Sequence, residues 1–314
     1  MLVRTYVFLD AQTLRIVSET RPMENQNFGI SAALTTPFDA DGQIDQERLL
    51  RHMRNLLSRG CRSVTLFGTT GEGPSIETEE RLDLLGRLAG ESMDPARINL
   101  ALHGTSASQV AQQARAALKL GVTTFLLPPP CYYDQPPEEG LANWFRGVLS
   151  QFAGTDARFI LYHIPQVIGV GLSVSLVQTL KSAFGPQVYG VKDSAGDFTH
   201  TSRLLALDDL QILVGDERQL ARGARLGAAG AISGIANMFP QRLVHCLETG
   251  KEDPSINRLV DEVVRFPVTP AVKAMVAHSY CDPQWRRTAP PLVALDDNAY
   301  VRLAEAHDEV PDSA

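Results

Sequence analysis

The chain has 314 residues, of which 44% are hydrophobic and 21% charged, so it can bury one large barrel or two ordinary domains and is not disordered overall. Its formal net charge of −7 gives no general attraction to phosphate backbones, and we expect no nucleic-acid partner. The four cysteines form no C-x-x-C pair and the seven histidines form no H-E-x-x-H motif. We therefore predict no metal site, and the scattered thiols are typical of a reduced intracellular protein.

Residues 1–28 are expected to form an N-terminal extension, unless Met23 is the true start and the extension is an artefact. Asp10 and Arg15 interrupt its apolar stretches, and no small-residue cleavage site follows a long apolar run, so it does not resemble a signal peptide. No apolar stretch elsewhere reaches membrane-spanning length. These features predict a cytoplasmic protein that does not bind membranes.

A regular alternation of strands and helices begins at residue 29. A β-rich run over 29–37 precedes a helix predicted over 46–59, which Asp45 caps and Gly60 ends. Seven more β-rich runs lie at 62–67, 97–103, 122–128, 158–164, 188–193, 210–215 and 229–234. Helices are predicted between them, from Thr78, from a Ser106-x-x-Gln109 capping box to Gly121, and near 138–152, 173–184, 199–205 and 217–226.

The eight runs are almost continuously apolar, as expected of parallel strands that are buried on both faces. Right-handed crossovers closed into a ring predict an α/β fold, a (β/α)8 TIM barrel over 29–239. Further helices over 240–314 are expected to form a C-terminal helical extension of the same domain. The alternative is an open doubly wound sheet, but no G-x-G-x-x-G motif follows the first strand.

Reactive side chains follow five of the predicted strands. They are Thr69 and Thr70 in a Gly68–Gly73 loop, Tyr132 and Tyr133, Tyr162, Lys192 with Asp193 and Ser194, and Asp216 with Glu217. Barrel enzymes build their active sites at the C-terminal ends of the strands. The sequence therefore predicts one site that contains hydroxyls, an amine and carboxylates.

Lys192 closes the apolar run 188–191, where burial disfavours its charged form. A neutral amine can attack a ketone, and the resulting iminium withdraws electrons so that a nearby C–C bond can break. The bland alternative is a strand-end lysine whose amine reaches solvent or pairs with Asp193.

The other candidates also have structural interpretations. Tyr162 is either a proton relay or a core tyrosine bonded to backbone. The loop with Thr69 and Thr70 is either a carboxylate site or a tight turn. Tyr132 and Tyr133 are compatible with an aromatic loop cap or an interface patch. Asp216 and Glu217 are common residue types at helix starts.

Together these motifs resemble the dihydrodipicolinate synthase / N-acetylneuraminate lyase superfamily over about residues 29–300. The residues that carry the resemblance are Gly68-Thr69-Thr70-Gly71-Glu72, Tyr132-Tyr133, Leu161-Tyr162-x-x-Pro165 and Gly190-Val191-Lys192-Asp193. Each motif is weak alone, but all four occur in order at spacings that fit a barrel.

The resemblance implies roles for individual residues. Lys192 would form a Schiff base with pyruvate or a 2-keto acid, and Tyr162 would transfer protons. Thr69 and Thr70 would bind the carboxylate, Thr70 would link Tyr162 to Tyr133, and Tyr133 would enter the site of a neighbouring subunit. The remaining substrate-binding positions would be Ser194, Asp216, Glu217 and Ile232. The resemblance also implies a homotetramer built as a dimer of dimers, with no cofactor and no metal.

One position departs from the synthase branch of this superfamily. That branch has an arginine two residues after the proline of the Tyr-x-x-Pro motif, where this sequence has Val167. Ser194 and the Asp216-Glu217 pair instead resemble the sugar-acid lyase branch. We therefore expect an aldolase or dehydratase of a 2-keto-3-deoxy sugar acid. The alternatives are 4-hydroxy-tetrahydrodipicolinate synthase, which joins pyruvate to aspartate semialdehyde, and a non-catalytic paralogue that binds a keto acid.

Overall fold

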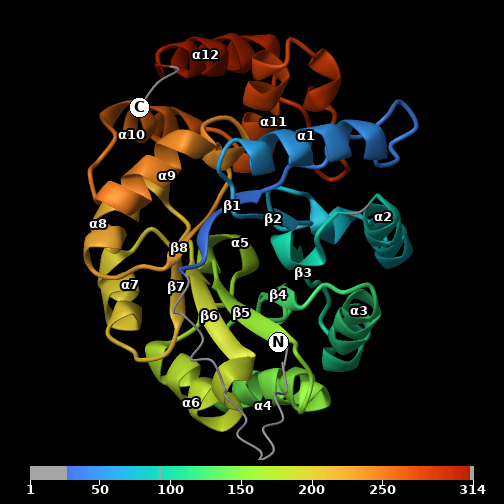
Figure 1. Cartoon of the computed structure of the whole chain (residues 1–314), viewed down its shortest axis with the longest axis vertical. Helices are drawn as coiled ribbons and strands as arrows, with labels where there is room; N and C mark the ends of the chain where they lie inside the picture. Colours follow the sequence, from blue (N-terminus) through green and yellow to red (C-terminus); the bar gives the residue numbers. More distant parts are fainter. Residues whose placement is uncertain (1–26, 92, 312–314) are drawn as a thin grey trace, which may run out of the picture.

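The computed structural model describes residues 27–91 and 93–311, so nearly all of the predicted extension over 1–28 lies outside the described residues. Eight parallel strands close into a barrel in chain order, which confirms the predicted TIM barrel (Figure 1). The strands are β1 (Gly29–Ala33), β2 (Ser63–Leu66), β3 (Ile98–Ala101), β4 (Thr124–Leu127), β5 (Arg158–His163), β6 (Val188–Asp193), β7 (Gln211–Val214) and β8 (Gly230–Ser233).

Helices surround the barrel (Figure 1). They are α1 (Gln46–Ser58), α2 (Thr78–Gly90), α3 (Ala107–Lys119), α4 (Glu138–Leu149), α5 (Pro165–Ile168), α6 (Val174–Phe184), α7 (Phe198–Leu205), α8 (Leu220–Arg225), α9 (Pro240–Thr249), α10 (Pro254–Val263), α11 (Val268–Ser279) and α12 (Asp297–Asp308). Short 3-10 helices are η1 (Gly73–Ser75), η2 (Pro95–Arg97), η3 (Ser150–Phe152), η4 (Gly185–Gln187), η5 (Glu217–Gln219), η6 (Ile235–Asn237) and η7 (Pro283–Arg286). Within the described ranges, no helix is long and apolar enough to cross a membrane.

The predicted helix ends are partly correct. Asp45 caps α1 by accepting a hydrogen bond from the Arg48 backbone N–H, as predicted. The capping box at Ser106 is wrong, because its side chain makes no cap bond and its Oγ instead lies 2.9 Å from the Ser108 Oγ. The predicted helices over 138–152 and 217–226 each contain a 3-10 turn, η3 at the end of the first and η5 at the start of the second.

Strand register sets which side chains share the barrel interior. Tyr162 of β5 pairs with Lys192 of β6, and Lys192 pairs with Leu213 of β7. Partners in adjacent parallel strands point to the same face, so these three side chains lie side by side. Tyr162 and Leu213 belong to a small apolar cluster that also contains Ile232 of β8, separate from the larger core between the sheet and the helices.

Polar side chains of β1, β2 and β3 form a buried cluster on one face of these strands. The Asn99 side-chain amide lies 3.0 Å from the Ser63 Oγ and 3.2 Å from the hydroxyls of Ser31 and Thr65. Each hydroxyl thus has a partner, as buried polar groups require. These residues precede the strand ends and occupy a layer beside the apolar cluster.

The C-terminal helices lie along one side of the barrel (Figure 1). Helix α9 packs against β1 and α8 in the ring, and α11 and α12 pack against each other outside it. The division of the chain at residue 239 stays a prediction. Thr269 and Lys273 of α11 reach back to the loop after β2, so this region contributes directly to the mouth of the barrel.

Candidate active site

Lys192 lies inside the barrel at the end of β6. Its side chain is buried, with 6% of the residue exposed. The Nζ lies 3.2 Å from the Tyr162 hydroxyl and 4.4 Å from the centre of the Tyr162 ring. The amine neither reaches solvent nor pairs with Asp193, so the alternative of a solvent-exposed or Asp193-paired lysine is wrong. An amine enclosed beside a phenol in this way is placed to meet a ketone that enters the barrel.

Tyr162 presents its hydroxyl to that amine. The residue is 4% exposed, and its hydroxyl accepts a hydrogen bond from Lys192, in contrast to a core tyrosine tied to backbone. Ile232 packs in the same buried cluster. A phenol within hydrogen-bond reach of the amine is placed to move protons at an adduct on Lys192.

The loop with Thr69 and Thr70 is tightly constrained. Phe67 and Glu72, on either side, both have φ of 58°, a left-handed conformation that non-glycine residues rarely adopt. A Cβ at Gly73 would lie 1.9 Å from the Phe67 carbonyl oxygen, so only glycine fits there. The Thr70 Oγ1 lies 3.7 Å from the position of a Cβ on Gly234, after β8. The two threonines therefore lie at the mouth of the barrel.

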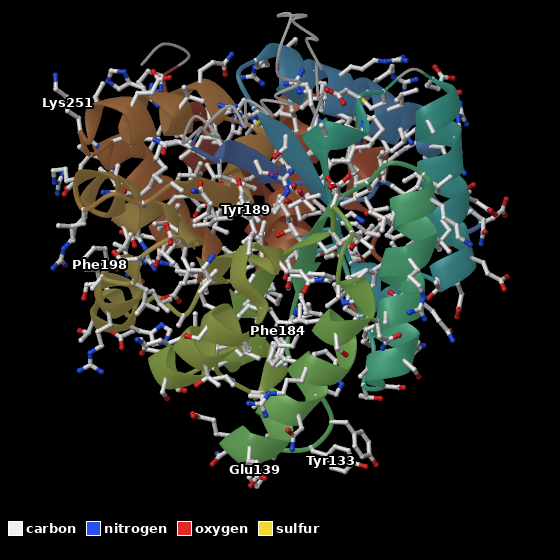
Figure 2. All side chains as sticks on the ribbon, turned by 60° about the horizontal axis from the view of Figure 1, so that its bottom comes forward. Tyr133, Glu139, Phe184, Tyr189, Phe198 and Lys251 are labelled. Atoms are coloured by element: carbon white, nitrogen blue, oxygen red, sulfur yellow. The ribbon has the colours of Figure 1, made fainter. Side chains whose placement is uncertain are left out.

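Tyr133 lies away from these groups within the same chain. It is 71% exposed and projects from the loop before α4 (Figure 2), and its ring contacts that of Tyr132 edge-on. Among the described residues, no hydrogen bond joins Thr70 to Tyr133 or to Tyr162, so the predicted relay is not formed within one chain. Two adjacent exposed tyrosines are a typical feature of protein interfaces.

The two acids after β7 differ in their surroundings. Glu217 Oε1 accepts hydrogen bonds from the Ser233 hydroxyl at 2.6 Å and the Ile235 N–H at 3.3 Å, and burial raises the pKa of Glu217. Asp216 instead caps η5, and both of its carboxylate oxygens accept hydrogen bonds from Arg218, at 2.9 and 2.7 Å. The helix-start interpretation thus describes Asp216, whereas Glu217 bonds to the strand end and loop of β8.

Ser194 lies beside these acids. Its Oγ would be 1.9 Å from a Cβ on Gly215, the residue before Asp216. The Ser194 backbone N–H donates to the His163 carbonyl oxygen at 2.9 Å, and the Ser194 carbonyl oxygen accepts from the Gln166 side-chain amide at 2.6 Å. Ser194, two residues after Lys192, thus lies against the end of β7, and Glu217 lies against the end of β8.

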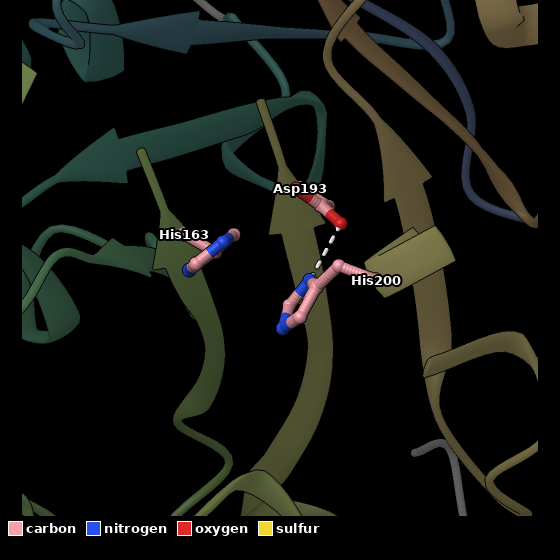
Figure 3. A group of neighbouring side chains, drawn as sticks. All are labelled: His163, Asp193 and His200. Carbon is pink, nitrogen blue, oxygen red and sulfur yellow. Dashed lines mark hydrogen bonds and ion pairs between the residues drawn. The ribbon is translucent and has the colours of Figure 1, made fainter. Parts of the chain in front are cut away.

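Asp193, His163 and His200 form a buried group behind β6 (Figure 3). The His200 Nδ1 lies 2.9 Å from Asp193 Oδ2 and its Nε2 lies 2.9 Å from the Leu172 carbonyl oxygen. The His163 Nδ1 accepts from the Leu172 N–H at 2.8 Å. Three of the four ring nitrogens are thus engaged in hydrogen bonds, which favours a structural network over a metal site.

A second histidine and aspartate group lies on the C-terminal helices. The Asp308 Oδ1 is 2.7 Å from the His278 Nε2 and 3.2 Å from the His307 Nδ1, and these hydrogen bonds lower the pKa of Asp308. Asp308 is largely exposed, and an ordinary surface ion pair accounts for this geometry. His200, Lys273 and this group could not be predicted from the sequence, since their partners are distant in sequence or carry no motif.

Comparison with known proteins agrees with this architecture. The model of the dihydrodipicolinate synthetase family matches residues 26–306. An uncharacterized DapA-like lyase of Chloroflexus aurantiacus is 38% identical over 218 residues, covering 68% of this chain and 71% of that protein. A 4-hydroxy-tetrahydrodipicolinate synthase of Corynebacterium diphtheriae is 33% identical over 219 residues, covering 69% of this chain and 71% of that protein.

A solved structure extends the likeness over most of the chain. The crystal structure of dihydrodipicolinate synthase from Agrobacterium tumefaciens has 47% sequence identity and a TM-score of 0.87, and the match covers 90% of this chain and 98% of that one. The resemblance predicted from the four motifs is thereby confirmed. This chain belongs to the dihydrodipicolinate synthetase family, a group of class I Schiff-base lyases.

Proposed function

We propose that this protein is a lyase that cleaves a 2-keto-3-deoxy sugar acid, or a related 2-keto acid, through a Schiff base on Lys192. The observation that carries the proposal is the contact between the buried Lys192 amine and the Tyr162 hydroxyl at 3.2 Å. A buried amine supplies the nucleophile, and the adjacent phenol supplies the proton transfers that iminium formation and C–C cleavage require.

The proposed retro-aldol sequence starts when the neutral Lys192 amine attacks the C2 ketone and water leaves, giving an iminium. Tyr162 removes the proton of the C4 hydroxyl. The C3–C4 bond breaks, its electron pair moves to the iminium, and an aldehyde and the enamine of pyruvate result. Protonation of the enamine at C3 and hydrolysis release pyruvate and the free lysine.

A dehydratase would use the same first step. Removal of a C3 proton from the iminium gives an enamine, which expels the C4 hydroxyl as water. Thr69 and Thr70 would bind the substrate carboxylate in either reaction. Both outcomes belong to the same class of lysine-dependent lyases, and product analysis separates them.

The substrate class rests on the groups around the mouth. Glu217 and the Ser194 hydroxyl offer oxygen atoms for a polyhydroxylated tail. Val167 on α5 is 58% exposed and offers no charge to a second carboxylate. A neutral, hydroxylated tail therefore fits this site better than aspartate semialdehyde, which carries a carboxylate and an ammonium group.

The second candidate is 4-hydroxy-tetrahydrodipicolinate synthase. The 47% identity to the Agrobacterium tumefaciens protein favours it, and Val167 argues against it. A coupled assay with pyruvate and aspartate semialdehyde, run beside a panel of 2-keto-3-deoxy acids, separates the two. Faster turnover of the semialdehyde than of every sugar acid would replace the first proposal by the second.

Borohydride trapping tests the shared chemistry. The protein is incubated with pyruvate and then reduced, and intact mass and peptide mapping locate the adduct. We expect one adduct, on Lys192, and none in Lys192→Ala, whereas the surface variant Lys251→Ala should trap as well as the wild type. An adduct elsewhere, or none, would overturn the mechanism. An adduct without turnover of any panel substrate would instead favour a non-catalytic keto-acid-binding paralogue.

A further inference from the structure

We propose that Lys273 and Thr269 of α11 are positioning residues that hold the Thr69–Thr70 loop in the shape that binds the substrate carboxylate. The inference rests on the proposed function and extends it, because it assigns a role in substrate binding to a helix outside the ring. Neither residue is placed in contact with substrate, and each would act through the loop alone.

The first observation is a fully buried ion pair. Lys273 Nζ donates to Glu72 Oε1 in the loop and, at 2.8 Å, to the Thr36 carbonyl oxygen after β1. Both side chains of the pair have 0% exposure. The other Glu72 oxygen accepts from the Ala289 N–H at 2.7 Å. Lys273 thereby connects the loops after β1 and β2, and Glu72 connects its loop to the segment after η7.

Burial perturbs both members of the pair. It raises the pKa of Glu72 and lowers the pKa of Lys273 to about 8, while each partner opposes the shift of the other. Desolvating two charges is costly, and a pair of apolar side chains often serves stability as well or better. A buried pair at this place is therefore better explained by the geometry that it imposes than by stability alone.

The loop needs such support because its backbone is strained. Thr69 and Thr70 lie between Phe67 and Glu72, which both have φ of 58°. Non-glycine residues keep this conformation only where surrounding contacts hold them. The Glu72 contact with Lys273 fixes one end of the strained segment, and the imidazole of His103 lies 2.5 Å from the Phe67 carbonyl oxygen at the other.

Two hydroxyls complete the support. Thr269 Oγ1 of α11 donates to the Thr69 carbonyl oxygen at 3.1 Å, and Thr36 Oγ1 donates to that of Gly71 at 2.7 Å. With both peptide planes held, the N–H groups and hydroxyls of the loop keep fixed directions toward the mouth. Fixed donors lose less entropy when they bind an anion, so loosening them should weaken binding before it affects the chemistry at Lys192.

The experiment measures borohydride trapping on Lys192 as a function of pyruvate concentration. Lys273→Met keeps most of the side-chain volume and removes the charge. We expect the pyruvate concentration for half-maximal trapping to rise by about tenfold, with the trapped fraction at saturation unchanged. Arg242→Met is the matched control, because Arg242 forms a largely buried ion pair with Asp253 on α9 and α10, away from the loop. It should lower Tm but leave half-saturation unchanged.

The outcomes separate positioning from stability. Equal trapping curves for Lys273→Met and Arg242→Met would overturn the inference while leaving the proposed function intact. No adduct in the wild type would overturn both. If Lys273→Met does not fold, Thr269→Val decides: it removes one hydrogen bond, and half-saturation should rise by about threefold with Tm little changed. An unchanged half-saturation in that variant would equally overturn the inference.

Discussion

The Lys192 amine and the Tyr162 hydroxyl meet because their residues are register partners on β5 and β6, and their side chains therefore leave the sheet at the same level and on the same face. The contact depends on strand pairing and not on a flexible loop. Sites built on strands hold their geometry more closely than sites built on loops. This arrangement yields a direct test of the phenol.

Tyr162→Phe removes the hydroxyl and keeps the ring. We expect turnover of the best panel substrate to fall by roughly a hundredfold or more, the usual range for a lost proton-transfer group. Trapping on Lys192 should persist but proceed more slowly, because the amine remains. The control is Tyr189→Phe, near the start of β6, the strand that carries Lys192. Equal turnover in the two variants would show that Tyr162 is only a packing residue.

The exposed Tyr133 predicts a site that two subunits share. If its hydroxyl enters a partner's barrel, Tyr133→Phe and Lys192→Ala should each be inactive alone, since each lacks one group. After mixing under conditions that exchange subunits, hybrid dimers contain one complete site. Activity should then recover to about a quarter of the wild-type value for random pairing of a symmetric dimer.

Tyr132→Phe is the control for that mixture, because the neighbouring ring is also exposed. No recovery on mixing, with hybrids confirmed by mass, would show that Tyr133 acts within its own chain. An active Tyr133→Phe variant before mixing would show that its hydroxyl is not needed. A monomer in sedimentation analysis would also contradict the predicted tetramer of two dimers.

Glu217 and Asp216 should differ when each is replaced by its amide. Glu217→Gln alters the carboxyl that bonds to Ser233 and should raise KM for sugar-acid substrates by about tenfold, with pyruvate trapping unchanged. Asp216→Asn breaks the ion pair with Arg218 and should chiefly lower stability, by about 1 kcal/mol, with little effect on KM. Kinetics and thermal melts distinguish the two. Equal effects on KM would mean that both acids contact the substrate tail.

The barrel could be predicted from sequence because each strand is a short, continuously apolar run. The runs overestimated strand length, as in 29–37 against Gly29–Ala33, since buried residues, among them Thr35 and Thr36, continue into the loop after the strand. Ser106 resembled a cap, but a neighbouring serine competed for its hydroxyl. Helix caps depend on local geometry that sequence spacing alone does not determine.

Most of the candidate site was also visible in the sequence, because it lies at strand ends. The supporting contacts were not. Glu72 and Lys273 are separated by 201 positions, and only the closed barrel brings α11 against the loop after β2. The entry of Tyr133 into the site of a neighbouring subunit stays a prediction, because the structure describes one chain.

His200 makes the stability of the protein depend on pH in a defined direction. Its two ring nitrogens face acceptors, the Asp193 carboxylate and the Leu172 carbonyl oxygen, so both bonds require the protonated ring. The hydrogen bond to Asp193 raises the pKa of His200 against the effect of burial. Burial acts to raise the pKa of Asp193, but hydrogen bonds from His200, Ala195 and Thr201 outweigh it and lower that pKa.

Two groups beside this pair also affect its charge. The His163 ring stacks on the His200 ring, with centres 4.1 Å apart. Burial, and to a smaller extent the charge of His200, lowers the pKa of His163. The His163 Nδ1 accepts a hydrogen bond from the Leu172 N–H, a role that only the neutral ring can fill. Asp197, at the start of α7, favours the charged form of His200. Asp193 and Asp197 thus both act to raise the pKa of His200.

The folded-state pKa of His200 lies above its unfolded value of 6.5. The contribution of His200 to stability is therefore complete below pH 6.5 and is lost as pH rises through the folded-state value. At the acidic end, the Asp193 contribution is present above pH 3.8 and is lost as pH falls through its lowered value. Denaturant melts of the wild type and His200→Gln measure the effect. The variant should be less stable by about 2 kcal/mol at pH 6, and the difference should shrink toward pH 9.

His52 and His103, whose burial lowers each pKa to about 4, titrate in both proteins and cancel from the difference curve. What remains is the titration of His200 together with its neighbours His163 and Asp193. His245→Gln, at an exposed position on α9, should match the wild type at every pH. A stability difference that is constant from pH 6 to pH 9 would show that His200 is neutral in the folded protein. In that case one of its two acceptor contacts would lack a proton.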